Sequence, residues 1–277
     1  MATRIKTRDS ASKEVVKIEE PTGALPSFLA DLAKEDSGKG VSRDQSDNIV
    51  PLIYVLQALS PQCNKRGPDY IEGAEDGAIW LRNSSEGVVS GEDGILFQPC
   101  YFQKDWVEWV PRAAGGGFAG RHDEKPGEAV EKSLDPEKPD RLSWVLPNGN
   151  TVMETRYHIG YVHLPDGRRL PYVIPMSSSA HTVSRGWMFL MNSKSSDGGK
   201  TVAPAWMALY RLRTKAKTKN GFNWSLWDVS DAGWIQSADD YTRGLALYNS
   251  FEGGEKIVEA PASQDIADPI SPESAAM

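Results

Sequence analysis

The feature that most constrains the fold is a succession of short apolar runs separated by turn signals, which begins near residue 66. Apolar and polar residues alternate or nearly alternate in these runs, for example in GILFQPCYFQKDWVEWVP and in TVMETRYHIGYVHLP. The tetrapeptides PNGN (147–150) and PDGR (165–168) each join two such runs, and Asn-Gly and Asp-Gly both favour hairpin turns with positive φ. Regularly spaced strands with hairpin turns predict an antiparallel sheet, either a barrel or a sandwich.

Three segments depart from this alternation. Apolar residues at helical spacing predict one short amphipathic helix over 25–32, which ends before Gly38. The apolar run at 49–59 is long enough for a buried helix, although its β-branched start also fits a strand. The segment HTVSRGWMFLMNS (181–193) favours a short helix between strands.

The rest of the chain divides by composition. Residues 1–22 are polar, charged and without periodicity, which predicts a disordered arm. Residues 112–140 are glycine-rich, then charged and proline-rich, and this composition is typical of a mobile insertion loop. Residues 253–277 are acidic and punctuated by proline, which predicts a disordered tail. A single domain is therefore expected over 23–252.

Composition excludes several classes of protein. No run approaches 18 consecutive apolar residues, so no transmembrane helix is expected, and the N-terminus lacks the apolar region of a secretory signal. Cys63 and Cys100 are too few for a disulfide framework or a cysteine-rich zinc site. These features predict a protein of the reducing cytoplasm.

Catalytic motifs are weak throughout the chain. His158 and His163 are expected on opposite faces of one strand, which is a poor arrangement for a shared metal. The RHDE sequence (121–124) reads more simply as solvated loop residues, and SSDGGKT (195–201) lacks the spacing of a phosphate loop. We therefore expect no enzyme activity, no metal and no cofactor.

Charge is distributed unevenly. The chain carries a formal net charge of −7, yet residues 181–221 contain eight Lys or Arg and one acid. Such a local positive field attracts polyanions to one face while the rest of the protein repels them. The alternative is a strand edge that lysines protect from aggregation.

The core of this basic region is the segment LYRLRTKAKTK. Its cations occupy every second position, so that on a strand they project from one face about 6.6 to 6.8 Å apart. This spacing is comparable with that of successive phosphates on an extended single strand, and neighbouring rings offer surfaces for base stacking. The candidate binding residues of this region are Arg185, Tyr210, Arg211, Arg213, Lys215, Lys217, Lys219 and Trp224.

A second concentration of cations and rings lies between residues 101 and 122. Gly115–Gly117 give a flexible segment next to an aromatic residue and two arginines, which suits the clamping of a flexible polymer, although loop drift produces similar patterns. The candidate binding residues of this region are Lys104, Trp106, Arg112, Phe118 and Arg121.

Two stretches resemble phage-encoded single-stranded DNA-binding proteins and related recombination or replication accessory proteins. They are SDNIVPLIYVLQALSPQ (46–62) and GKTVAPAWMALYRLRTKAKTKNGFNWSLWDV (199–229). The resemblance implies an oligonucleotide-binding (OB) barrel and an acidic tail that recruits partner enzymes. The tail here ends in PESAAM without a terminal aromatic residue, which departs from the family's simplest members.

Together these features predict a mostly β protein: a five-stranded OB-like barrel or a closely related sheet, with N-terminal helices added. The expected function is to bind single-stranded DNA with little sequence preference, in phage replication or recombination in the host cytoplasm. The expected partners are single-stranded DNA and replication or recombination enzymes, and an oligomer is compatible with the sequence. The rival interpretations are a virion structural or assembly protein and a metal-dependent nuclease.

Overall fold

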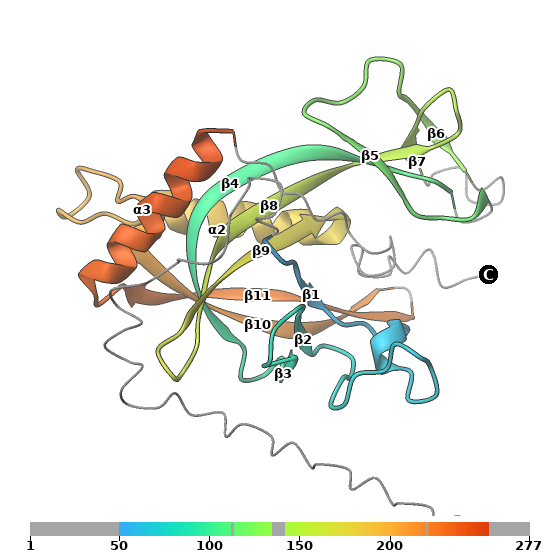
Figure 1. Ribbon diagram of the computed structural model, residues 1–277. Coiled ribbons are helices and arrows are strands. Elements are labelled where there is room, and N and C mark those ends of the chain that lie inside the picture. The colour runs from blue at the N-terminus through green and yellow to red at the C-terminus, as the bar shows by residue number, and fades with distance from the viewer. Residues whose placement is uncertain (1–49, 112–113, 135–141, 220, 255–277) are drawn as a thin grey trace, which may run out of the picture. The chain divides into compact units, whose positions relative to one another are not determined.

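A computed structural model describes residues 50–111, 114–134, 142–219 and 221–254 (Figure 1). All of them belong to one unit, Gln45–Met277. The expected N-terminal arm, the expected helix over 25–32 and all but the first two residues of the acidic tail lie outside the described residues.

The described chain is mostly β, as predicted. Its helices are α2 (His181–Ser193) and α3 (Ala238–Glu252), with short 3-10 turns at Pro61–Cys63 (η2), Ser178–Ala180 (η4) and Ala205–Met207 (η5). Neither α2 nor α3 has the length and apolar character needed to span a membrane. The strands are β1 (Ile53–Val55), β2 (Ile79–Leu81), β3 (Val88–Val89), β4 (Ile95–Trp109), β5 (Phe118–His122), β6 (Val130–Ser133), β7 (Leu142–Val145), β8 (Thr151–His163), β9 (Arg169–Ser177), β10 (Ala208–Lys219) and β11 (Phe222–Trp234).

The strands form two antiparallel sheets. The larger sheet has eight strands, with the order β11-β10-β4-β8-β7-β6, and β5 and β9 pair with β4 and β8 respectively. The smaller sheet has the order β1-β2-β3. Among the described residues the strands do not close into the expected barrel, because β9 and β11 form no strand pair with each other. Alternation and hairpin turns predict neighbouring strands but not closure, which depends on contacts between distant segments.

Both predicted hairpins are confirmed. PNGN joins β7 to β8 and PDGR joins β8 to β9, and their glycines Gly149 and Gly167 have φ of +86° and +91°. The left-handed region is open to glycine at little steric cost, which is why these dipeptides mark the turns.

In its described part, residues 50–59, the apolar run contains the short strand β1 and no helix. Residues 53–55 pair with β2, and Leu52 makes a parallel bridge to Val173 of β9. The helix over 181–193 is confirmed. Helix α3 was not predicted, although Ser237 accepts a hydrogen bond from the amide of Asp239 and so caps its N-terminus.

The segment expected to be a loop over 112–140 contains strands in its described part. Strand β5 pairs with the end of β4, and β6 pairs with β7. We call the described residues 114–134 and 142–150 the insertion. A small apolar cluster of Ala129, Leu146 and Val152, with Trp106 and Trp144 packed against it, gives this region a core of its own. Apolar burial therefore orders a segment whose composition resembles a loop.

Two apolar clusters cover the two faces of the larger sheet. The first contains Phe97, Tyr210 and Leu212, and Trp187 of α2 packs into it. The second contains Tyr157, Ile159 and Val173, and it is covered by Phe251 of α3 and by residues that precede and form β1. Figure 1 shows α3 at the opposite side of the fold from the insertion.

Candidate nucleic-acid interface

The predicted basic strand is β10, and its cations share one face. Tyr210 and Leu212 are fully buried in the first cluster, so the odd-numbered residues of the strand point to the other side of the sheet. Arg211 is half-buried, and Arg213, Lys215, Lys217 and Lys219 are exposed. We call these five cations the basic track.

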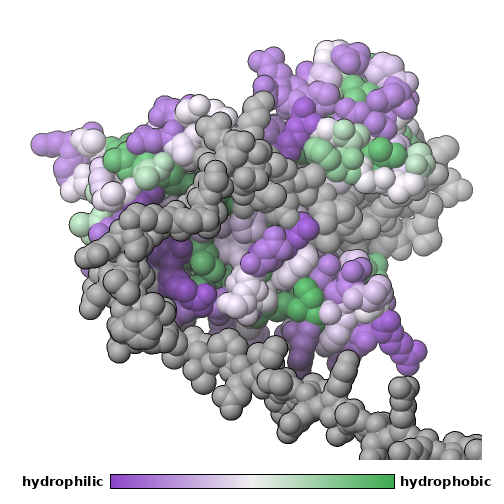
Figure 2. All heavy atoms as spheres, viewed as in Figure 1, coloured by the Kyte–Doolittle hydropathy of each residue, from purple (hydrophilic) through white to green (hydrophobic). Residues whose placement is uncertain are grey.

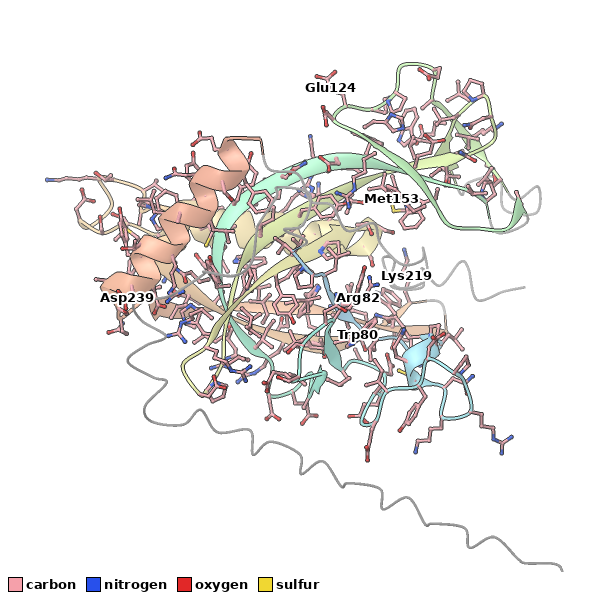
Figure 3. The ribbon with its side chains drawn as sticks, in the orientation of Figure 1. Trp80, Arg82, Glu124, Met153, Lys219 and Asp239 are labelled. Atoms are coloured by element: carbon pink, nitrogen blue, oxygen red, sulfur yellow. The ribbon has the colours of Figure 1, made fainter. Side chains whose placement is uncertain are left out.

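The basic track runs toward the tip of the β10–β11 hairpin. Lys219 pairs with Phe222 as the last pair before the turn, where Gly221 has a φ of +81°. Figure 3 labels Lys219 at this tip and Asp239 at the start of α3, on the opposite side of the view. The outer part of the track therefore lies on a projecting hairpin, away from α3.

One member of the track is neutralised by its neighbour on β11. Lys215 forms an ion pair with Asp228, and both side chains are 46% exposed. In the described part of the chain no ion pair involves the other four cations. The track therefore offers a net positive charge to a ligand. This charge is smaller at the centre of the track, where Asp228 pairs with Lys215.

The rings expected beside the track are not available for stacking. Tyr210 is 0% exposed and Trp224 is 9% exposed, and both belong to the first apolar cluster. Trp224 lies opposite Lys217 in the strand register, so the two side chains share one face of the hairpin. Trp224 is nevertheless buried there in the first apolar cluster, so the expectation that its ring is on the surface is wrong. Burial of so large a ring stabilises the fold and removes it from the solvent.

One ring is instead exposed in the described part of the insertion. Phe118 is 37% exposed and makes an edge contact with Trp109 at 6.3 Å between ring centroids. The guanidinium of Arg121 lies 5.9 Å from the centre of the Phe118 ring and 5.2 Å from that of Tyr157. The structure thus brings Phe118 and Arg121 together as predicted, whereas Arg112 lies outside the described residues.

The remaining candidates are Lys104, Trp106 and Arg185. They lie on the face of the larger sheet that α2 covers, opposite the face that carries Phe118 and Arg121. Trp106 is half-buried against the apolar cluster of the insertion, while Lys104 and Arg185 are exposed on β4 and α2. Lys104 lies directly opposite Arg156 of β8. Arg156 was not predicted, although its place two residues before His158 on an alternating strand puts both side chains on one face.

A polar group holds the insertion hairpins together. Glu108 accepts hydrogen bonds from Asn150, Asn148 and the ring of His122, which is 2.9 Å away. The bond from Asn150, with the others, lowers the pKa of Glu108 despite the opposing effect of burial. His122 of the RHDE sequence therefore has a structural partner. In the described ranges no group of three or more potential metal ligands occurs.

His158 and His163 lie in separate environments, as predicted from their spacing. His158 is 1% exposed, contacts Ser184 at 2.9 Å and stacks on Trp187 at 4.3 Å between ring centroids. His163 contacts Gln98 at 2.9 Å. Burial, assisted by nearby arginines, lowers the pKa of His158 to about 3 and that of His163 to about 4.

These histidines should make the protein labile to acid. Between pH 6.5 and about 4 the unfolded chain binds protons at both residues while the folded chain does not, so stability falls as the pH falls. Urea unfolding should give a lower free energy of unfolding at pH 5 than at pH 7, and His158→Gln should reduce this difference. An equal pH dependence in wild type and variant would assign the effect to other groups.

The comparisons with known proteins place the chain in a phage family. The Pam3 phage gp34-like protein family matches residues 19–256, which is most of the chain. The chain belongs to the Pam3 phage gp34-like family. No curated protein and no solved structure matches it. The match covers both stretches that resemble single-stranded DNA-binding proteins, and it supports the expected phage origin alone.

Proposed function

We propose that this Pam3 phage gp34-like protein binds single-stranded DNA with little sequence preference, in phage replication or recombination. The observation that carries the proposal is the basic track, with five cations at alternate positions on one face of a strand. Of these five cations, only Lys215 has an anionic partner among the described residues. Flexible single strands can follow such a track, since phosphate contacts need no base readout.

The strand order supports an OB-like arrangement. Apart from short inserted elements, the chain order of the main elements is β4, β8, β9, α2, β10 and β11. In the sheet, the five strands are ordered β9-β8-β4-β10-β11. Numbered 1 to 5 along the chain, this order is 3-2-1-4-5 with a helix between the third and fourth strands. It is the strand order of an OB barrel that is left open between strands 3 and 5.

The gap between β9 and β11 is spanned by the segment around β1. Leu52 bridges to Val173 of β9, and the side-chain amide of Gln57 exchanges hydrogen bonds of 2.9 and 3.0 Å with the backbone of Ser225 on β11. Ile53 belongs to the first apolar cluster, whereas Leu52 and Tyr54 belong to the second. This segment thus takes the place where strands 3 and 5 would pair in an OB barrel.

The same comparison suggests where a DNA strand lies. OB folds bind oligonucleotides on the face of strands 2 and 3 and on the loops between strands 1 and 2 and between strands 4 and 5. Here the face of β8 and β9 is partly covered by Leu52, Tyr54 and Phe251. The corresponding loops are the insertion with Phe118 and the β10–β11 turn beyond Lys219. Both lie toward the right in Figure 1, on the side of the fold away from α3.

Figure 2 shows the mixed character of the insertion surface. Hydrophilic and hydrophobic residues lie next to one another at the upper right, over the insertion. Val130 and Leu142 are 56% and 53% exposed there. Bases have apolar faces and phosphates are charged, so a mixed surface suits both parts of a nucleotide chain.

Titration of labelled oligonucleotides tests the proposal. Fluorescence anisotropy should show binding to a single-stranded DNA of mixed sequence that weakens steeply with salt, and weaker binding to a duplex of equal length. Divalent-metal-dependent cleavage of the oligonucleotide would favour the nuclease instead. Failure of every oligonucleotide to bind would leave the virion interpretation as the better one.

Asp228→Asn should tighten binding. The substitution removes the carboxylate that pairs with Lys215 and keeps the size of the side chain. An exposed ion pair contributes up to about 1 kcal/mol, so the gain should be about twofold to fivefold at low salt and vanish as screening increases. Lys215→Ala alone should accordingly have a smaller effect than Lys217→Ala. Weaker binding by Asp228→Asn would contradict this charge arrangement.

Deletion of residues 255–277 should also tighten binding at low salt. This segment carries five acids and one lysine, so it can compete with DNA for the basic track. The competition is electrostatic, and the gain should shrink as ionic strength rises while the melting temperature stays nearly unchanged. Equal affinity at every salt concentration would show that the acidic tail serves solubility or partner docking instead.

A further inference from the structure

A pocket lies between α2, the bulged part of β4 and the segment before β10. Its volume is about 270 Å³, just below the roughly 300 Å³ at which small-molecule sites begin. Beside small aliphatic residues, the wall carries the aromatic and thioether side chains of Tyr101, Phe102, Met188, Met191, Trp206 and Tyr248. Val202, at its edge, is 58% exposed. Such a wall favours a single planar ring over an extended aliphatic chain.

Three elements each place a cation one step beyond this pocket, in the same direction. On β4 and β8, the paired residues Phe102 and His158 line the pocket, and the next pair on that face is Lys104 and Arg156. On α2, Met188 and Asn192 line the pocket, and Arg185 precedes Met188 by three residues on the same face of the helix. A residue step of two on a strand is about 6.6 Å, and a helical turn is about 5.4 Å.

The charges of this group are not balanced. Arg156 pairs with Glu154 at 2.7 Å. Burial tends to raise the pKa of this carboxylate, but the hydrogen bond and charge of Arg156, with the charges of His181 and Lys104, lower it. His181 contacts the backbone carbonyl of Glu154 at 2.8 Å. Lys104 and Arg156 are like charges directly opposite each other on neighbouring strands, an arrangement that destabilises a sheet. A bound anion would relieve this repulsion.

We propose that this pocket is a nucleotide-binding site, with a nucleobase between the aromatic side chains and its phosphate on Lys104, Arg156 and Arg185. The inference rests on the proposed function for the source of the nucleotide, which would be one unit of the bound DNA strand. A free nucleotide presents the same chemistry. The site is separate from the basic track, which lies on the other face of the larger sheet.

Titration calorimetry with thymidine monophosphate, thymidine and inorganic phosphate tests this site. Thymidine monophosphate should bind, and thymidine should bind about 10- to 150-fold more weakly, since a charge-assisted contact is worth about 1.5 to 3 kcal/mol. Arg185→Glu and Lys104→Glu should each weaken the nucleotide about tenfold or more. Ala203→Phe, which places a ring in the pocket, should abolish its binding. Arg243→Glu, an exposed change on α3, is the matched control and should have no effect.

Binding of a labelled oligonucleotide to the same variants distinguishes the two sources of the nucleotide, a unit of the bound DNA strand and a free nucleotide. Weaker oligonucleotide binding by Arg185→Glu, in parallel with the mononucleotide, supports a unit of the strand. Loss of mononucleotide binding alone supports a free nucleotide as the ligand. Oligonucleotide binding by a wild-type protein that does not bind thymidine monophosphate would overturn the pocket and leave the proposed function intact. Mononucleotide binding that Ala203→Phe and Arg185→Glu leave unchanged, with both variants folded, would also overturn it.

Discussion

Replacing Arg213, Lys217 and Lys219 together by alanine should weaken binding to single-stranded DNA by tenfold or more at low salt. These cations are exposed and, in the described ranges, unpaired, so each is free to contact a phosphate. Each lost contact should flatten the salt dependence of log K by about 0.7, so the slope should fall by about 2. Anisotropy titrations at several salt concentrations measure both quantities.

The control is Lys200→Ala with Arg243→Ala, which removes exposed cations from other elements. It should change the affinity by less than twofold. An unchanged slope in the triple variant, with an unchanged melting temperature, would remove β10 from the binding surface.

Trp187→Ala should destabilise the protein by about 3 to 5 kcal/mol, the usual cost of deleting a large buried ring. Trp187 is 1% exposed and lies 4.3 Å from His158, 5.8 Å from Phe97 and 5.7 Å from Tyr210 between ring centroids. Its loss leaves a cavity where α2 docks on β4, β8 and β10. Urea unfolding at pH 7 gives the free energy.

Phe189→Ala on the same helix is the matched control. Phe189 is 72% exposed, so its truncation should cost less than about 0.5 kcal/mol. Similar costs for the two variants would mean that α2 does not dock through Trp187.

The local structure could be predicted from the sequence because its determinants are local. Alternation predicted β4, β8, β9, β10 and β11, and the Asn-Gly and Asp-Gly dipeptides predicted the two hairpins. The alternate cations of β10 also predicted correctly that they share one face. Period and turn chemistry are properties of a few neighbouring residues.

What could not be predicted depends on distant contacts. The segment around β1 meets β9 and β11 through Leu52 and Gln57, and nothing near these residues in the sequence indicates it. Trp224 is buried although its cross-strand neighbour Lys217 is exposed, because tertiary packing decides burial. Helix α3 is a different case, because its signal is local and was missed: Ser237 caps the helix, and Asp239 and Asp240 lie in its first turn.

The candidate site was predicted in part. Phe118 and Arg121 lie together, and the basic track is intact, but Lys104 and Arg185 lie on the opposite face, near Arg156. Sequence spacing within β4 could not show this, because the bulge between Pro99 and Tyr101 shifts which residues face the core.

Photocrosslinking tests the central claim most directly. The full-length protein is irradiated with a single-stranded oligonucleotide that carries a photoreactive base, and the crosslinked peptides are identified by mass spectrometry. The account predicts crosslinks within residues 211–222 and near Phe118, which disappear when unlabelled single strand is added in excess. Competed crosslinks confined to other surfaces, such as β2, β3 and the turn η2, would contradict it.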